Sequence, residues 1–446
     1  MSHIQSSISY KAIWKIAYPI IIGNMAQSLL AFVDTAFLGH LGRIELGASM
    51  MAGIYYFTFS TLAWGFAMGI QIVIARRFGE KKFPCIGEVF EHGLLIGAAI
   101  ALLLFGMLHF LTAPILSSII ESPSIYNAAM QFMDYRHFGI LFVCFNFLYR
   151  ALYIGLSNTK MITYSTILMV CINIIFAYLL IFGNFGFPKM GIGGAALASV
   201  FAEISAMIFF TFITIKTLPL KKYALFTWHK IRGALIKSLL SLSIPTMMQR
   251  LISFGIWFIF FALIEHLGEL PIAISGIVRS VYMLLAIPVF AFGATANTLT
   301  SRMIGEKKER ELGATLFKIM KLSFLCIIPI LVVVLSIPEH IVSIYTPDTE
   351  LAVAAIPTLY VICASMLLLA FAMIYFEAVS GTGNTKIALY LELGVLCVYT
   401  FYIMLLAVKL KAPIEWVWSS EYVYATLIGG FSLLYMKYGN WIKKKV

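Results

Sequence analysis

The segment RRFGEKK at positions 76–82 returns later in the chain as RMIGEKK at positions 302–308. The offset between these two segments also aligns Pro19 with Pro245, and it aligns the tripeptide His-Leu-Gly at 40–42 with the one at 266–268. It aligns GLSNTK at 155–160 with GTGNTK at 381–386 as well. Because chance rarely keeps one register over so long a stretch, the chain contains two copies of one structural unit.

The composition predicts an all-α polytopic membrane protein. Of its 446 residues, 61% are hydrophobic and only 12% are charged, whereas soluble domains carry about 25% charged residues. Apolar runs of about 20 residues, the length that spans a bilayer, recur along the whole chain. The twelve predicted transmembrane helices are 13–38, 46–75, 87–112, 128–155, 161–183, 191–215, 239–264, 271–300, 314–337, 351–380, 386–409 and 417–437.

Six spans in each copy return the chain to its starting side, so the two copies should share one orientation in the membrane. We therefore expect two pseudo-symmetric six-helix lobes, 1–215 and 239–446, joined by a basic linker at 216–238. Paired lobes of this kind are typical of transporters that work by alternating access. A repeat that serves packing alone is the alternative.

The basic residues indicate the orientation. The net charge is +12, and only Arg43, Lys189, Lys409 and Lys411 fall on the side opposite the termini. The side shared by both termini holds 22 lysines and arginines, in the loops and at the chain ends. The positive-inside rule then places both termini in the cytoplasm. This explains the charge without nucleic acid as a partner and fits a multi-pass protein of a bacterial inner membrane.

Asp34 lies in the segment FVDTAFLGHLG at 32–42, fifteen residues after Pro19 within the first apolar run. A carboxylate in hydrocarbon costs several kcal/mol and usually has a function. Asp34 could face an interior cavity and exchange a proton or bind Na⁺, or it could end the helix near the outer face. Proline within a span frees a carbonyl and permits a bend, so Pro19 is a candidate helix-bend residue.

Other polar residues within the spans are candidates for the substrate cavity or its gate. Asn173 could join helices or form part of a site, and Ser199 and Glu203, one turn apart, share a helix face. Glu377 and Glu392 are the other carboxylates within the spans. Arg250 and Arg279 could each pair with a carboxylate, which the sequence does not specify. Arg150 and Glu377 occupy nearly equivalent places in the two halves. They could meet across the inner mouth, or each could reach the interface separately.

Motifs of enzymes are absent from the sequence. It contains no G-x-S-x-G, H-E-x-x-H or P-loop, and its six cysteines form no CxxC pair and are typical of small apolar residues. We therefore expect no enzyme activity, no cofactor and no certain metal site. An ion gradient of H⁺ or Na⁺ is then the expected energy source.

Three segments resemble the multidrug and toxic compound extrusion (MATE) family: FVDTAFLGHLG, ARRFGEKK at 75–82 and NIIFAYLLIFGNFGFPKMGIGGAALAS at 173–199. The resemblance covers essentially the whole chain. It implies export of organic cations, dyes and drugs in exchange for Na⁺ or H⁺. It also implies that the two lobes rock around a central cavity.

The resemblance implies roles for particular residues. Asp34 matches the acidic residue of the first span that takes part in cation coupling, and Asn173 and Ser199 match positions of the same site. Ala177 replaces an aspartate that some members carry. Other members use acids in spans seven and ten, where this chain has Ser253 and Leu369, so a cation site of that type is not expected in the carboxy-terminal lobe.

The resulting hypothesis is that Asp34 binds H⁺ or Na⁺ near Asn173 and Ser199, which changes the bend at Pro19 and lowers the affinity for a cationic substrate. We expect the protein to act as a monomer in the lipid bilayer on small organic cations. A flippase for lipid-linked oligosaccharides or lipids is the nearest alternative, although an anionic phosphate needs several arginines. A membrane-embedded enzyme and a transporter-derived sensor are further alternatives.

Overall fold

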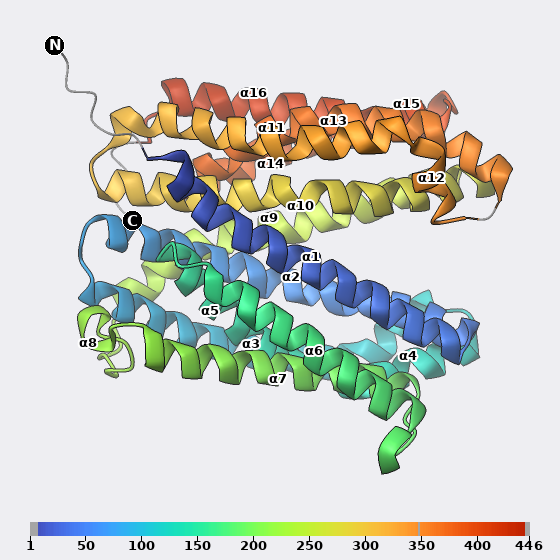
Figure 1. Ribbon diagram of the computed structural model, residues 1–446, viewed down its shortest axis with the longest axis horizontal. Coiled ribbons are helices and arrows are strands. Elements are labelled where there is room, and N and C mark those ends of the chain that lie inside the picture. Colours follow the sequence, from blue (N-terminus) through green and yellow to red (C-terminus); the bar gives the residue numbers. More distant parts are fainter. Residues whose placement is uncertain (1–7, 347, 442–446) are drawn as a thin grey trace. The chain divides into compact units, whose positions relative to one another are not determined.

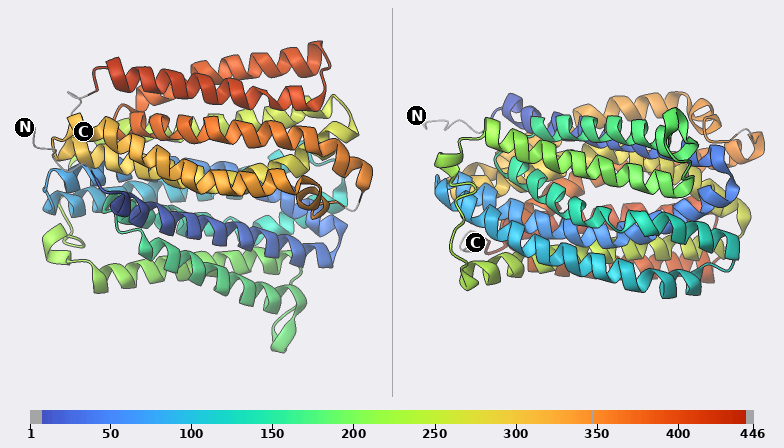
Figure 2. Two further views of the ribbon diagram at one scale, coloured as in Figure 1. Left: turned by 45° about the horizontal axis from the view of Figure 1, so that its top comes forward. Right: turned by 90° about the horizontal axis from the view of Figure 1, so that it is seen from below.

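The computed structural model describes residues 8–346 and 348–441, and this part of the chain forms helices and connecting turns without strands (Figure 1). Figure 2 shows the same helices from two further directions. The order is α1 (Tyr10–Leu41), α2 (Arg43–Gly79), α3 (Pro84–Ile119), α4 (Pro123–Arg136), α5 (Gly139–Gly155), α6 (Lys160–Phe182), η1 (Asn184–Gly186), α7 (Ile192–Thr217), α8 (Leu220–Tyr223), α9 (Gly233–Glu265), α10 (Glu269–Gly305), η2 (Glu309–Glu311), α11 (Leu312–Ser336), α12 (Pro338–Ser343), α13 (Thr349–Gly381), α14 (Thr385–Ile403), η3 (Met404–Lys409), α15 (Ile414–Trp418) and α16 (Ser420–Tyr438).

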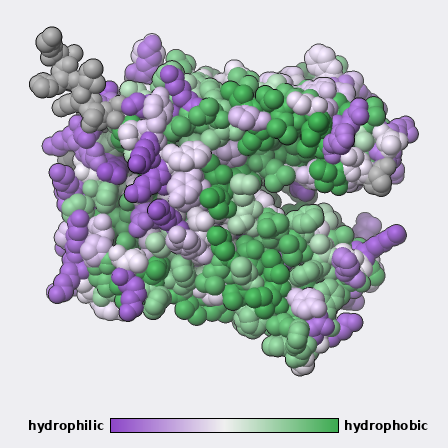
Figure 3. Space-filling model, in the orientation of Figure 1, coloured by the Kyte–Doolittle hydropathy of each residue, from purple (hydrophilic) through white to green (hydrophobic). Residues whose placement is uncertain are grey.

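Each of the twelve predicted spans coincides with helix. Within the described residues, ten helices are long and apolar enough to cross a membrane. The predicted span 128–155 is formed by α4 and α5, which are bent by 54° and together make an eleventh candidate. The predicted last span, 417–437, corresponds to α16. Several helices extend beyond the predicted limits because helical hydrogen bonding continues past the apolar core. Hydrophobic residues cover the middle of the helices, and hydrophilic residues gather toward their ends (Figure 3).

The chain forms two compact units, and both changes between them fall within a helix. One unit is Ile22–Met247, and the other joins the residues up to Ile21 with those from Met248 onward. The boundary after Ile21 and the boundary after Met247 are separated by the offset of the repeat. Each lies two residues after a proline, Pro19 in α1 and Pro245 in α9. The lobe limits 1–215 and 239–446 remain predictions about the functional halves.

The unit Ile22–Met247 includes the first part of α9, which packs closely on α2. The Ser243 hydroxyl donates to the Phe66 carbonyl at 3.1 Å, and the Thr246 hydroxyl donates to the Gly65 carbonyl at 2.7 Å. A Cβ on Gly65 would lie 2.6 Å from the Cα of Met247. Gly65 and Gly69 form a G-x-x-x-G pattern, whose missing side chains allow two helices to approach this closely.

The other unit incorporates the beginning of α1 in its own packing. The rings of Trp14 and Phe292 lie 6.2 Å apart, and Lys318 donates to the Ile8 carbonyl at 3.2 Å. Its core packs α10, α13 and α16 together around the buried side chains of Trp418 and Phe260. The beginning of α1 therefore belongs structurally with the second repeat.

The repeat is also visible in the backbone of the turns. Lys81 and Lys307, which the repeat aligns, have φ values of 59° and 58°. Glu80 accepts hydrogen bonds from Arg77 and Lys82, and Glu306 does the same from Arg302 and Lys308. Partial burial alone would raise the pKa of both carboxyls, but the basic neighbours hold each pKa below its usual value. Both turns are therefore stabilised as ion-pair clusters.

Substitution of Gly69 by Ala should destabilise the protein by about 1–3 kcal/mol, because the new Cβ would overpack against α9. That Cβ would lie 2.8 Å from the Cα of Ser243. Gly53→Ala is the matched control on the same helix, since no atom lies within 4 Å of its Cβ position. The readout is the thermal unfolding midpoint in detergent. Equal midpoints for the two variants would contradict the close contact of α2 with α9.

Candidate functional site

A buried ion pair lies within the unit Ile22–Met247. Arg136, at the end of α4, donates to both carboxylate oxygens of Glu203 on α7, at 2.9 and 2.6 Å. The guanidinium also stacks on the Tyr56 ring, 3.8 Å from its centroid. Asn146 donates to the Glu203 carbonyl at 2.9 Å. The two-point geometry and the aromatic face satisfy both charges inside the helix bundle.

Asn173 and Ser199 contact each other, as the sequence predicted. The Asn173 amide on α6 donates to the Ser199 hydroxyl on α7 at 3.1 Å. Asn173 is 1% exposed, and no hydrogen-bond partner for its Oδ1 occurs within the described part of the chain. Ala177, one turn further along α6, is fully buried in the apolar core. The Oδ1 atom of Asn173, which can accept a hydrogen bond or bind a cation, is therefore left open next to Ser199.

Asp34 occupies the second part of α1 and is partly exposed. Among residues 8–346 and 348–441, none donates a hydrogen bond to its carboxylate. Arg136 is close enough to interact with it electrostatically. Arg136 is therefore the electrostatic neighbour of Asp34, and no hydrogen bond joins Asp34 to Asn173 or Ser199 among these residues.

A cavity of about 150 Å³ lies inside the other unit. It is lined from five helices, α9, α10, α13, α14 and α16, by three charged side chains and many rings. The charged residues are Arg250, Glu392 and Glu421. The lining rings are Trp257, Tyr282, Phe290, Phe376, Tyr399 and Tyr424. Carboxylates surrounded by aromatic faces are suited to bind an organic cation.

Two carboxyl groups of this cavity have no ion-pair partner in the described parts of the chain. Glu392 on α14 accepts a hydrogen bond of 2.5 Å from Ser253, and its other oxygen, Oε2, is buried without a partner there. Glu421 on α16 accepts hydrogen bonds from Tyr399 at 2.9 Å and Tyr282 at 3.1 Å. Both carboxyls are therefore held by neutral donors, and a bound cation or proton would complete them.

Ser253 and Leu369 both line this cavity. Glu392, from a different helix, lines it as well and accepts the hydrogen bond from Ser253. The expectation that this lobe has no cation site built on acids at positions 253 and 369 stays a prediction.

Arg250, which lines the same cavity, pairs with Glu377 at 2.7 Å, and Glu377 also accepts a hydrogen bond from Asn297 at 3.1 Å. Arg250 therefore has a carboxylate partner, which the sequence could not specify. The proposed contact of Glu377 with Arg150 joins the two units and stays a prediction. Arg279 lies over the Phe261 ring at 5.4 Å. Pro19 lies inside α1, as expected.

Sequence reasoning missed Arg136, Tyr56 and Glu421. Arg136 ends a segment of mixed polarity, and Glu421 begins the last helix, so neither interrupts a long apolar run. Among the described residues, no group of three or more histidine, cysteine or acidic side chains could hold a metal ion.

The comparison with protein families assigns the chain. A family model described as MatE matches residues 19–179 and 245–406. The chain belongs to the MatE family. The two matched ranges begin at Pro19 and Pro245, which the repeat aligns, so each range covers one copy of the repeat. The resemblance found in the sequence is thereby confirmed.

Individual relatives are more distant. The chain is 27% identical over 271 residues to a probable multidrug resistance protein NorM of Agrobacterium fabrum, covering 60% of this chain and 58% of the relative. It is 29% identical over 223 residues to a protein of the same name from Streptococcus pneumoniae, covering 49% of each chain. The chain thus spans about half the length of these curated relatives.

Solved structures confirm the fold. A multidrug resistance MATE family transporter of the MOP superfamily, solved in an outward-facing conformation, superposes with a TM-score of 0.84. It is 19% identical and covers 96% of this chain and 95% of its own. This MatE protein is therefore an all-helical multi-pass membrane protein with the twelve-helix, two-lobe layout of its family. The neighbour itself is named a transporter.

Replacing Glu203 by Gln should destabilise the protein by about 3–5 kcal/mol, because Arg136 would keep its charge in a buried place. The double variant Arg136→Met with Glu203→Leu removes both charges and should recover most of that loss. The measurement is the thermal unfolding midpoint of the two variants and the parent in the same detergent. A double variant as unstable as the single one would contradict the pair's role as a matched set of charges.

Proposed function

We propose that this MatE protein is a cation-coupled antiporter that exports organic cations by alternating access between its two lobes. The observation that carries the proposal is the cavity of the carboxy-terminal unit. Its carboxyls Glu392 and Glu421 lie among aromatic rings, and no ion pair satisfies them within the described residues. Such a site can hold an organic cation by charge and by ring contacts, or a proton or Na⁺ in its place.

Asp34 is the proposed coupling residue of the amino-terminal unit, assisted by Asn173 and Ser199. Its electrostatic interaction with Arg136 and the open Oδ1 of Asn173 support this role. When Asp34 takes up H⁺ or Na⁺, the local charge changes and α1 is free to alter its bend at Pro19. Substrate and coupling ion then compete for carboxylates, so that binding of one lowers the affinity for the other.

The family's relatives support the substrate class, since those described above are named as multidrug resistance proteins. The proposal places the protein as a monomer in the inner membrane, with both termini in the cytoplasm. The basic loops, among them 76–82 and 302–308, support this orientation through the positive-inside rule.

A flippase for anionic lipid-linked sugars has less support. It requires arginines that are free to bind phosphate. In the two polar clusters the arginine charges are already compensated, Arg136 by Glu203 and Arg250 by Glu377. The net charge of the carboxy-terminal cavity therefore favours a cation.

The direct test uses purified protein in liposomes loaded with a fluorescent cationic dye. A Na⁺ gradient and a pH gradient are imposed separately, and dye flux is followed with each. The parent should move dye only with a gradient, and the gradient that works identifies the coupling ion. Asp34→Asn should reduce this flux at least about tenfold, because a neutral side chain cannot exchange the ion. Gradient-independent lipid scrambling without dye flux would instead indicate a flippase.

Glu392→Gln should weaken dye binding and flux by a similar factor, because it removes a carboxyl of the cavity without changing its shape. Glu339→Gln is the matched control, since Glu339 is an exposed carboxylate on α12, outside the cavity. Flux at the parental rate in Glu392→Gln would remove the carboxy-terminal cavity from the mechanism.

A further inference from the structure

The linker between α7 and α9 is held against α3 by an unusual set of contacts, all within the unit Ile22–Met247. Glu91 on α3 accepts hydrogen bonds from the backbone N–H of Thr227 at 2.7 Å and of His229 at 2.8 Å. It also contacts Nδ1 of His229 at 2.8 Å. Arg232 pairs with Glu88 at 3.0 Å, and its backbone N–H donates to Nε2 of His92 at 3.0 Å. Separate polar contacts with Glu88, Glu91 and His92 thus fix one short segment.

The linker backbone is strained to reach this position. Ala224, Phe226 and Trp228 have φ values of 49°, 59° and 54°. Residues other than glycine rarely adopt such positive values. The alternation turns the N–H groups of residues 227 and 229 toward one anion, the Glu91 carboxylate. Gly87 allows this approach, because a Cβ there would collide with the Ala224 carbonyl. Strained segments persist only where the surroundings over-determine them, and they cluster at ligand-binding places.

Beneath this linker lies a cavity of about 550 Å³, a size typical of ligand pockets. Most of its wall is apolar and is formed by Leu94, Leu95 and Ala98 of α3, Phe145 of α5, and Phe226, Trp228 and Ile231 of the linker. The polar residues Glu91, His92 and His229, which hold the linker, also line it. Trp228 is 88% exposed and Ile231 is 69% exposed. The linker thus presents apolar side chains outward in addition to lining a cavity.

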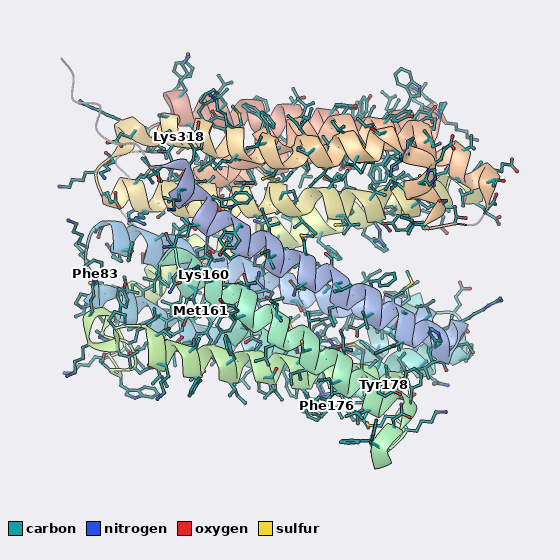
Figure 4. All side chains as sticks on the ribbon, viewed as in Figure 1. Phe83, Lys160, Met161, Phe176, Tyr178 and Lys318 are labelled. Carbon is teal, nitrogen blue, oxygen red and sulfur yellow. The ribbon has the colours of Figure 1, made fainter. Side chains whose placement is uncertain are left out.

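The position and charge of this cavity indicate its occupant. It lies near the start of α3, because residues 91–98 of that helix line it together with residues 226–231 of the linker. Phe83, labelled in Figure 4, directly precedes α3, and its ring contacts Lys222 of α8, which is labelled in Figure 1. Residues 218–232 carry Lys221, Lys222, Lys230 and Arg232 and no acidic residue. Because Arg232 is paired with Glu88 of α3, the three lysines supply the charge for an anion. Tryptophan side chains favour the membrane interface, and basic residues there attract anionic lipids. An apolar cavity beside such charges matches a phospholipid, with acyl chain and headgroup bound by different parts.

We propose that this linker and α3 form a binding site for an anionic phospholipid of the leaflet at the basic side of the protein. The acyl chain enters the cavity along Leu95 and Ala98, beneath Trp228. The headgroup phosphate is held by the basic linker, with Lys230 as the exposed cation. This site is separate from the polar clusters proposed for transport, and its occupancy does not depend on the proposed function.

The test uses phosphatidylglycerol with brominated acyl chains as the probe, added to the full-length protein in phosphatidylcholine nanodiscs. Bromine quenches nearby tryptophan, and the emission of Trp228 is obtained as the difference between the parent and Trp228→Phe. The expected result is that brominated phosphatidylglycerol quenches this emission at a lower mole fraction than brominated phosphatidylcholine. Equal quenching by the two lipids would overturn the proposal, because it would show no selection of the anionic headgroup.

Two pairs of variants separate the parts of the site. Ala98→Phe fills the cavity and should abolish the selective quenching, whereas Ala99→Phe, on the same helix but outside the lining, should preserve it. Lys230→Gln should raise the mole fraction for half-quenching about fivefold, the equivalent of one lost basic residue near an anionic surface. Lys237→Gln, exposed on α9, is its control. Selective quenching that survives Ala98→Phe would overturn the cavity as the binding place. Displacement of the lipid by a transported dye would do so as well, since it would assign the cavity to substrate.

Discussion

A charge inside a helix bundle in hydrocarbon needs a partner, and this constraint organises the polar residues of both units. Each unit contains an arginine–glutamate pair that joins two helices of the bundle, Arg136 with Glu203 and Arg250 with Glu377, in which the charges cancel. These pairs therefore have a structural role. The candidate-site carboxyls Asp34 in one unit and Glu392 and Glu421 in the other have no salt-bridge partner among the described residues. They are the groups whose charge a proton, Na⁺ or an organic cation can compensate.

The repeat preserves the backbone but not this chemistry. The turns that contain Lys81 and Lys307 have nearly the same geometry in the two copies, and the unit boundaries in α1 and α9 obey the same offset. The carboxyls are not repeated at this offset, since Asp34 aligns with Phe260 and Glu392 aligns with Thr166. The two units therefore share a fold but differ in their sites. A division of roles follows, with one partly exposed carboxylate on α1 and an aromatic cavity with two acids in the other unit.

Much of the fold could be predicted from the sequence, because apolar runs and repeat offsets are local or linear signals. All twelve predicted spans coincide with helix, and Asn173 and Ser199 meet as expected. Side-chain partners could not be predicted in the same way. Arg136 and Glu203 are 67 residues apart and Ser253 and Glu392 are 139 apart, so each pairing depends on how two helices are rotated about their axes. Glu421 was missed because it lies at the start of a helix, where a charge is ordinary.

The proposed transport depends on open carboxyls that bind either substrate or coupling ion. The most direct measurement is the dissociation constant of tetraphenylphosphonium for the detergent-solubilised protein, determined across pH and across Na⁺ concentration. Competition predicts that affinity falls as the coupling ion becomes more concentrated, either as pH decreases or as Na⁺ increases. It also predicts release of that ion when tetraphenylphosphonium binds. An affinity that is independent of both pH and Na⁺ would contradict the shared use of these carboxyls.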